Sequence, residues 1–230
     1  MPARMTEFKG RVLIIAGSDS GGGAGVQADI KAVTMLGGYA ATAITAITVQ
    51  NTLGVSGVHP IPIPFVTAQA RAVLDDIGAD AIKTGMLGSA EMVEAVAEII
   101  AGAGVAAVVD PVMIAKGGAA LLEDSAIAAV RERLIPLAAL LTPNAPEAQA
   151  LTGVSIETTD DLRRAGDALL ALGAAAVLMK GGHVAGDTVT DLLITPAGET
   201  SFSGARIDTR HTHGTGCTLA SAIAAGLAQG

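Results

Sequence analysis

The chain has 230 residues, of which 50% are hydrophobic and 16% charged, so its composition excludes an intrinsically disordered protein and allows one large domain with a substantial core. Its 14 basic and 22 acidic residues give a net charge of −8, which argues against a nucleic-acid or membrane-surface partner. One cysteine excludes an internal disulfide and fits a reducing compartment, and no apolar run approaches the length of a membrane span. We therefore expect a soluble, cytoplasmic protein.

The first half of the chain predicts strands that alternate with helices. Residues 11–17 (RVLIIAG) form a continuous apolar run that ends at glycine, which is typical of a strand buried on both faces. A glycine-rich loop at 18–25 and a helix over 26–38 follow. The other elements expected in this half are strands at 40–50, 79–87 and 105–113 and helices at 66–77 and 89–101, the last with Ser89 as N-cap.

The second half continues the alternation. Pro146 suits the first position of a helix over 146–151, and Thr159 is interpreted as the N-cap of a helix that runs to residue 172. Two strands at 189–195 and 200–207, joined by Pro-Ala-Gly-Glu, predict an antiparallel hairpin. The other elements expected here are a helix at 125–134, strands at 137–142 and 175–180, and a final helix that begins near Thr215 or Gly216.

This alternation predicts an α/β fold with a mostly parallel central sheet, helices on both faces and an antiparallel hairpin at one edge. Linkers and repeats are absent from the sequence, so residues 1–230 are expected to form a single domain. The last residues still show a helical pattern, and we expect the native protein to continue past them. Ligands of such sheets bind at the carboxyl ends of the strands. That rule places the following residues on one rim: Gly17 to Gly25, Gln50, Met86, Asp110, Asn144, Lys180 and Cys217.

The run from His213 to Thr218 (HGTGCT) is the most informative motif, because it places the cysteine at the start of a helix, just after two glycines. Glycines allow the backbone to approach a ligand closely, and the free amides at a helix start bind anions. A thiol at that position is expected to ionise more easily than a free one. Phosphoryl transfer needs both such amides and a base. The local pattern also allows a second interpretation, in which Cys217 is simply a small buried helix residue.

The glycine-rich loop excludes two common nucleotide-binding motifs. It lacks a strict G-x-G-x-x-G, because Val26 stands at the third glycine position, which weakens the case for a dinucleotide-binding oxidoreductase. No glycine in the chain precedes a lysine, so a Walker A loop is excluded. These glycines either contact a ligand or only permit a tight turn.

Several polar residues stand where strands are expected to end. Lys180 could contact phosphate or could be an edge lysine that extends to solvent. Asn144 and Glu147 could hold Mg²⁺ through water, or could cap a helix and complement its dipole. Asp110 precedes Pro111 and should face the rim. Three histidines lack metal-ligand spacing and are interpreted as loop residues: His183, His211 and His213.

Seven segments occur in an order that resembles one known family. They are AGSDSGGGAGVQADIK (16–31), ITVQNT (47–52), KTGML (83–87), DPVM (110–113), TPNAPEA (142–148), LMKGGH (178–183) and HTHGTGCTLASA (211–222). Together they resemble the hydroxymethylpyrimidine/phosphomethylpyrimidine kinases of thiamin biosynthesis, which belong to the ribokinase superfamily. The cysteine in GTGC is specific to this resemblance, because sugar kinases of the superfamily have aspartate there. The resemblance spans nearly the whole chain from Arg11 onward.

The resemblance implies a three-layer ribokinase-like fold, ATP as co-substrate and Mg²⁺. It implies that Cys217 is the base toward the acceptor oxygen and that the amides of Gly214, Thr215 and Gly216 form the anion hole. The other implied roles are ATP contacts for Lys180, Thr215, Asn144 and Lys116, Mg²⁺ contacts for Glu147, Asn144 and Asp110, and pyrimidine contacts for Gln50, Asp29, Gly17, Thr48 and Met86. The family also has C-terminal helices, and we expect this sequence to stop short of them. We also expect a homodimer.

Three alternatives to a pyrimidine kinase remain open from the sequence. A pyridoxal kinase of the same superfamily would bind a substrate of similar shape, although the amide of Gln50 suits an aminopyrimidine edge. A non-catalytic protein that binds the pyrimidine is the second alternative. The third alternative is a nucleotide-binding oxidoreductase, although the sequence lacks the fingerprint motif of that class.

Overall fold

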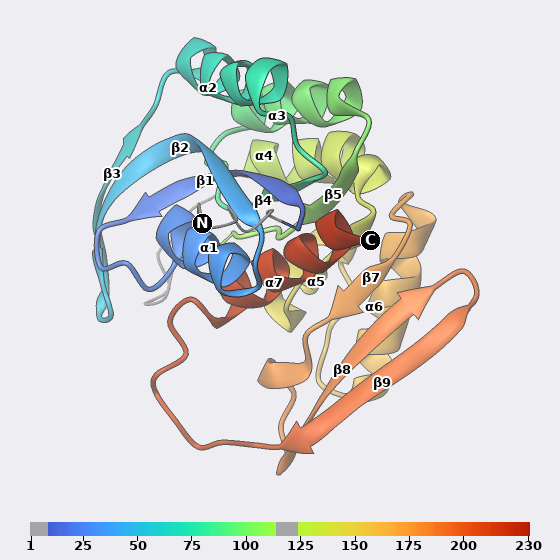
Figure 1. Cartoon of the computed structure of the whole chain (residues 1–230). Coiled ribbons are helices and arrows are strands. Elements are labelled where there is room, and N and C mark those ends of the chain that lie inside the picture. The colour runs from blue at the N-terminus through green and yellow to red at the C-terminus, as the bar shows by residue number, and fades with distance from the viewer. Residues whose placement is uncertain (1–8, 114–123) are drawn as a thin grey trace, which may run out of the picture.

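The computed structural model describes residues 9–113 and 124–230, and these residues form one nine-stranded sheet in the order β3-β2-β1-β4-β5-β6-β7-β8-β9 (Figure 1). Its central strands all pair in parallel, as the sequence predicts. Their carboxyl ends therefore meet at one edge. These strands are β2 (Tyr39–Asn51), β1 (Arg11–Asp19), β4 (Ala81–Thr84), β5 (Ala106–Val109), β6 (Leu140–Leu141) and β7 (Val177–Met179).

Antiparallel strands close both edges of the sheet. The predicted hairpin is confirmed as β8 (Thr188–Thr195) and β9 (Gly198–Ala205), with β8 paired to β7. At the other edge, β3 (Gly54–Pro60) pairs antiparallel with β2. The sequence pattern does not indicate β3, because glycine and proline, which occur in it, are depleted in strands. Such residues are tolerated at an edge, where one side of the strand has no partner.

Helices cover both faces of the sheet, and the alternating residues of β1 show which helices lie on each face. Val12 and Ile14 pack against one pair of helices, whereas Leu13 and Ile15 pack against the larger group on the other face. Figure 1 shows the pair, α1 (Gly25–Met35) and α7 (Thr215–Gln229), side by side on the same face of the sheet. The opposite face carries α2 (Ile63–Asp76), α3 (Ala90–Ala103), α4 (Asp124–Ala129), α5 (Ala145–Thr152) and α6 (Thr159–Ala171).

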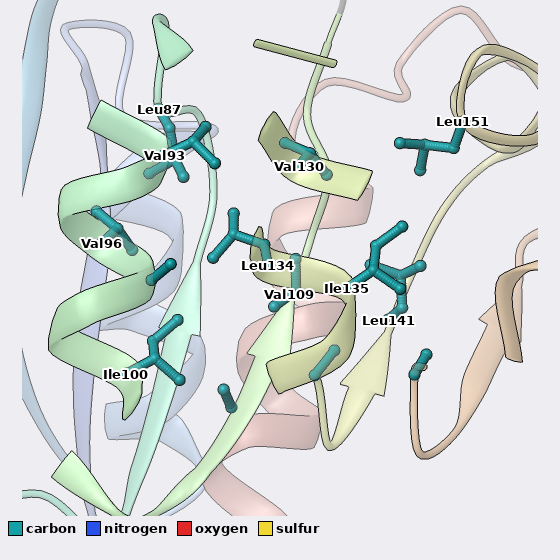
Figure 2. Close-up of a cluster of buried hydrophobic side chains, with 14 of the residues drawn as sticks. Leu87, Val93, Val96, Ile100, Val109, Val130, Leu134, Ile135, Leu141 and Leu151 are labelled. Atoms are coloured by element: carbon teal, nitrogen blue, oxygen red, sulfur yellow. The ribbon is translucent and has the colours of Figure 1, made fainter. Parts of the chain in front are cut away.

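The larger core consists of aliphatic side chains, in keeping with the 2% aromatic content of the chain. Figure 2 shows Val96 and Ile100 of α3 facing the sheet, close to Val109 of β5 and to Leu134. Each such side chain stabilises the fold by about 1.5–3 kcal/mol when it is fully buried. This packing fixes the strand ends that carry polar residues.

In the part of the chain that the structure describes, no helix is long and apolar enough to cross a membrane.

Several predicted element boundaries are wrong, among them those of the strands expected at 79–87 and 105–113, which are reduced to β4 and β5. The N-cap of α6 is Thr158 and not Thr159, because Asp161 at the third helical position completes a capping box with Thr158. The helix expected at 125–134 continues from α4 into a π-helical turn and a short 3₁₀ turn, Ile135–Leu137. The strand expected at 137–142 is therefore reduced to β6.

Candidate active site

A cleft of about 400 Å³ opens at the carboxyl ends of the parallel strands. Most of the residues that the sequence places on one rim line it, from Gly17 near the end of β1 to Cys217 in the first turn of α7, whereas residues 20–23 of the glycine loop do not. The lining also includes Thr48, Glu147, Gly214, Thr215 and Gly216. Of the other predicted site residues, Lys116 lies outside the described residues, and Asp29 lies beneath the cleft and does not form part of its wall.

Two glycines allow the starts of α1 and α7 to meet in this cleft. Gly214 has φ +77°, and a Cβ there would lie 1.7 Å from the carbonyl oxygen of Gly23. Gly25 has φ +56°, and its Cβ would lie 2.4 Å from the oxygen of Gly17. No side chain fits at either position, so the two loops pack backbone against backbone. The free amides of both helix starts are consequently close to one ligand site.

Asp19 holds the glycine loop in place. Its carboxylate accepts hydrogen bonds from the amides of Gly21 (2.7 Å), Gly23 (3.0 Å) and Ala24 (2.8 Å), and it lies 2.8 Å from His213 Nε2. Burial opposes ionisation of Asp19, but these hydrogen bonds outweigh burial and lower its pKa. Asp19 therefore joins the loop after β1 to the loop before α7.

From the sequence, Asp19 is expected on the rim without a role of its own, and His213 is interpreted as a loop residue. The structure places both in the lining, and His213 Nε2 also lies 3.4 Å from the side-chain nitrogen of Gln50. An aspartate followed by glycines is a sequence signal for a carboxylate that caps backbone amides, and could have identified Asp19. His213 has no comparable local signal, since Asp19 is 194 residues away.

The environment of Cys217 differs from the sequence expectation of an easily ionised thiol. Burial raises the pKa of the Cys217 thiol above its ordinary value, and Asp110 and Asp29 raise it further. Lys83 and a hydrogen bond from the amide of Gly25 act in the opposite direction without reversing the shift. The expectation was wrong because it considered the helix start alone and not the cost of removing a thiolate from water.

Asp29 does not reach the cleft because it is bound in a buried ion pair. Both of its oxygens lie 2.9 Å from Lys83 Nζ, and neither side chain is exposed. Burial raises the pKa of Asp29, although Lys83 opposes the shift. Unlike Asp29, Lys83 does form part of the cleft lining. The direct pyrimidine contact expected of Asp29 is therefore corrected to a position beneath the site.

A second group of charges surrounds Lys180. Its Nζ lies 3.2 Å from Asp110 Oδ1 and 3.9 Å from Glu147 Oε2. Burial alone would lower the pKa of Lys180, but the two carboxylates outweigh burial and raise it. Burial also raises the pKa of Glu147 to about 7, against the opposing effect of Lys180. A Cβ on Gly216 would lie 3.3 Å from Lys180 Nζ, so this cation lies directly beside the turn before Cys217.

Asn144 and Glu147 form the capping box of α5, which confirms the capping interpretation of these two residues. Asn144 Oδ1 accepts from the Glu147 amide (2.9 Å), and Glu147 Oε2 accepts from the Asn144 amide (2.8 Å). Asp110 and Glu147 still present carboxylate oxygens to the cleft, whereas the described residues contain no cluster of three or more metal-ligating side chains. Mg²⁺ commonly uses one or two carboxylates together with substrate phosphates and water. The donor set of the cleft fits that mode.

The chain is similar to proteins of known name along nearly its whole length. A model of the phosphomethylpyrimidine kinase family matches residues 19–230. Hydroxymethylpyrimidine/phosphomethylpyrimidine kinases of Streptomyces coelicolor and Bacillus subtilis are 55% and 50% identical to it. The alignments cover 95% and 96% of this chain and 81% and 82% of those proteins.

Two solved structures show the same fold. The phosphomethylpyrimidine kinase of Clostridium difficile has a TM-score of 0.85 at 42% identity, covering 96% of this chain and 92% of that chain. A Bacillus subtilis pyridoxal kinase, solved as an ADP complex, has a TM-score of 0.89 at 38% identity, covering 96% and 85%. The three-layer ribokinase-like fold is thus shared with pyrimidine kinases and with pyridoxal kinases alike.

Proposed function

The chain belongs to the phosphomethylpyrimidine kinase family, and we propose that it phosphorylates 4-amino-5-hydroxymethyl-2-methylpyrimidine with ATP and then converts the monophosphate to the diphosphate, as required for thiamin biosynthesis. The observation that carries this proposal is the position of Cys217. It lies at the start of a helix, in a cleft that also contains Lys180 and the amides of a glycine turn. The named pyrimidine kinases are also more similar in sequence than the pyridoxal kinase, at 42–55% against 38% identity.

Each group in the cleft has a task in this reaction. Cys217 takes the proton from the acceptor hydroxyl, whose oxygen then attacks the γ-phosphorus while the bond to the ADP oxygen breaks. The amides of Gly214, Thr215 and Gly216 face the charge that develops on the transferred group, and Lys180 adds a cation beside them. Asp110 and Glu147 would hold Mg²⁺, which would supply further positive charge at the ATP phosphates.

A coupled assay tests the reaction directly. The purified protein with MgATP should form ADP when the pyrimidine monophosphate is added, and should form only a background amount without it. Parallel reactions contain the unphosphorylated pyrimidine or pyridoxal. A higher kcat/KM with pyridoxal would favour the pyridoxal kinase, and calorimetric binding of the pyrimidine without any turnover would favour the non-catalytic protein.

Replacing Gln50 with leucine tests the substrate side of the cleft. The Gln50 amide lines the cleft and can pair with a ring nitrogen and the neighbouring amino group of the pyrimidine. Leucine leaves those two groups unpaired, at a cost of about 1–3 kcal/mol. We expect kcat/KM for the pyrimidine to fall by about 5- to 150-fold, with ATP affinity unchanged. Gln149→Leu is the matched control, because Gln149 is exposed on α5 outside the cleft. A loss confined to ATP affinity would reverse the placement of the two substrates.

Cytoplasmic location and homodimer formation stay predictions from the sequence. The single cysteine fits a reducing compartment. Light scattering of the purified protein would measure the oligomeric state.

A further inference from the structure

A fully buried charge network lies beneath the cleft and joins three elements of the fold. Lys83 of β4 contacts both oxygens of Asp29 on α1 at 2.9 Å, and Ser221 Oγ of α7 donates to Asp29 Oδ1 at 2.7 Å. None of the three side chains is exposed. Buried ion pairs seldom stabilise a protein more than apolar residues of similar size would. The network therefore requires a reason other than stability.

The helical spacing places this network one turn below Cys217. Ser221 follows Cys217 by four residues on α7, and Asp29 follows Gly25 by four residues on α1. Residues with this spacing share a helix face. The amide of Gly25 also acts on the pKa of the thiol, so α1 and α7 both connect the surroundings of the sulfur to the network. Lys83 completes the arrangement, because it lines the same cleft as Cys217.

Four charged groups act on the thiol from the surrounding elements: Lys83 on β4, Asp29 on α1, Asp110 after β5 and Lys180 after β7. Among the charges that shift the pKa of Cys217, Lys83 has the largest effect, and as a cation it favours the thiolate, as does Lys180. Burial alone would lower the pKa of Lys83, but Cys217, Asp29 and Asp110 raise it to about 12. The ammonium group thus stays charged at neutral pH.

We infer that Lys83 is a positioning residue for phosphoryl transfer, whose buried ammonium group, held by Asp29, which Ser221 in turn hydrogen-bonds, is the fixed counter-charge of the Cys217 thiolate. The inference rests on the proposed role of Cys217 as the base. In the step itself, the acceptor proton moves to the sulfur and Lys83 keeps all its protons. Asp29 keeps the cation in place when the sulfur becomes neutral.

The single cysteine of the chain allows a direct test, because iodoacetamide then reports on one thiol. The alkylation rate against pH gives the pH at which the thiol ionises, without ATP or pyrimidine. In the double variant Lys83→Met/Asp29→Asn, which leaves no unpaired buried charge, this pH should rise. Alkylation at a fixed pH below the inflection should be slower, by a factor of ten for each pKa unit of the rise. The pH profile of kcat/KM should shift in the same direction.

Two further variants test the direction in which the ionisation of the thiol changes and provide a control. Asp29→Asn alone removes the competing carboxylate and leaves the cation, so the thiol should ionise at lower pH and react faster. Lys31→Met removes an exposed lysine beside the glycine loop, and its inflection should equal that of the wild type. If the folded double variant and Asp29→Asn both kept the wild-type inflection, Lys83 would be a structural residue only. Kinase activity of the wild type is measured separately, so the inference and the proposed function can fail independently.

Discussion

Replacing Cys217 with alanine is expected to lower kcat by about 10²- to 10⁴-fold, the usual effect of losing an acid–base group. The KM for the pyrimidine should change little, because the thiol acts mainly in the transition state. Steady-state kinetics with the pyrimidine and MgATP measure both quantities. Iodoacetamide should inactivate the wild type, and ATP together with the pyrimidine should protect it, because the thiol lies in the cleft between them.

The pH dependence identifies the group that was lost. Because burial raises the pKa of the Cys217 thiol, only a small fraction is ionised at neutral pH, and this fraction grows as the pH rises. The kcat/KM of the wild type should therefore increase with pH, and the alanine variant should lose this increase. Cys217→Asp is the matched variant, since its carboxylate ionises at lower pH and should move the increase downward. Near-normal turnover of Cys217→Ala would reduce Cys217 to a packing residue.

Much of the fold follows from local patterns in the sequence. The apolar run at β1 and the alternation of strands with helices predict a covered parallel sheet, and the parallel pairing then brings the strand ends to one edge. That rule alone places Gln50, Asp110, Lys180 and Cys217 around one cleft. Neither their distances nor their roles were required for this prediction.

The interactions beneath and across the cleft could not be predicted in this way. Lys83 and Asp29 are 54 residues apart, so no local pattern pairs them. A lysine inside the short apolar strand β4 was the available signal, because a buried lysine needs a partner. The raised pKa of Cys217 could not be predicted from a local pattern either, since burial of the thiol depends on the packing of α1, α7 and the sheet together.

Replacing Gly214 with alanine is expected to lower kcat by about 10²- to 10³-fold, even though the variant removes no functional side chain. The added Cβ would lie 1.7 Å from the oxygen of Gly23, and the φ of +77° is unfavourable for alanine. The turn must therefore shift, which moves its amides away from the transferred phosphoryl group. Loss of one such donor typically reduces turnover by that factor. Turnover of the folded variant under saturating MgATP and pyrimidine is the measurement.

Gly226→Ala provides the control within the same helix. Gly226 is exposed on α7, has no positive φ, and a Cβ there would meet no atom within 4 Å. Alanine should leave kcat unchanged and should raise the free energy of unfolding by about 0.5–1 kcal/mol, because it favours the helix. Urea unfolding of both variants separates a loss of stability from a loss of catalysis. Wild-type turnover in Gly214→Ala would show that the turn before Cys217 does not form the anion hole.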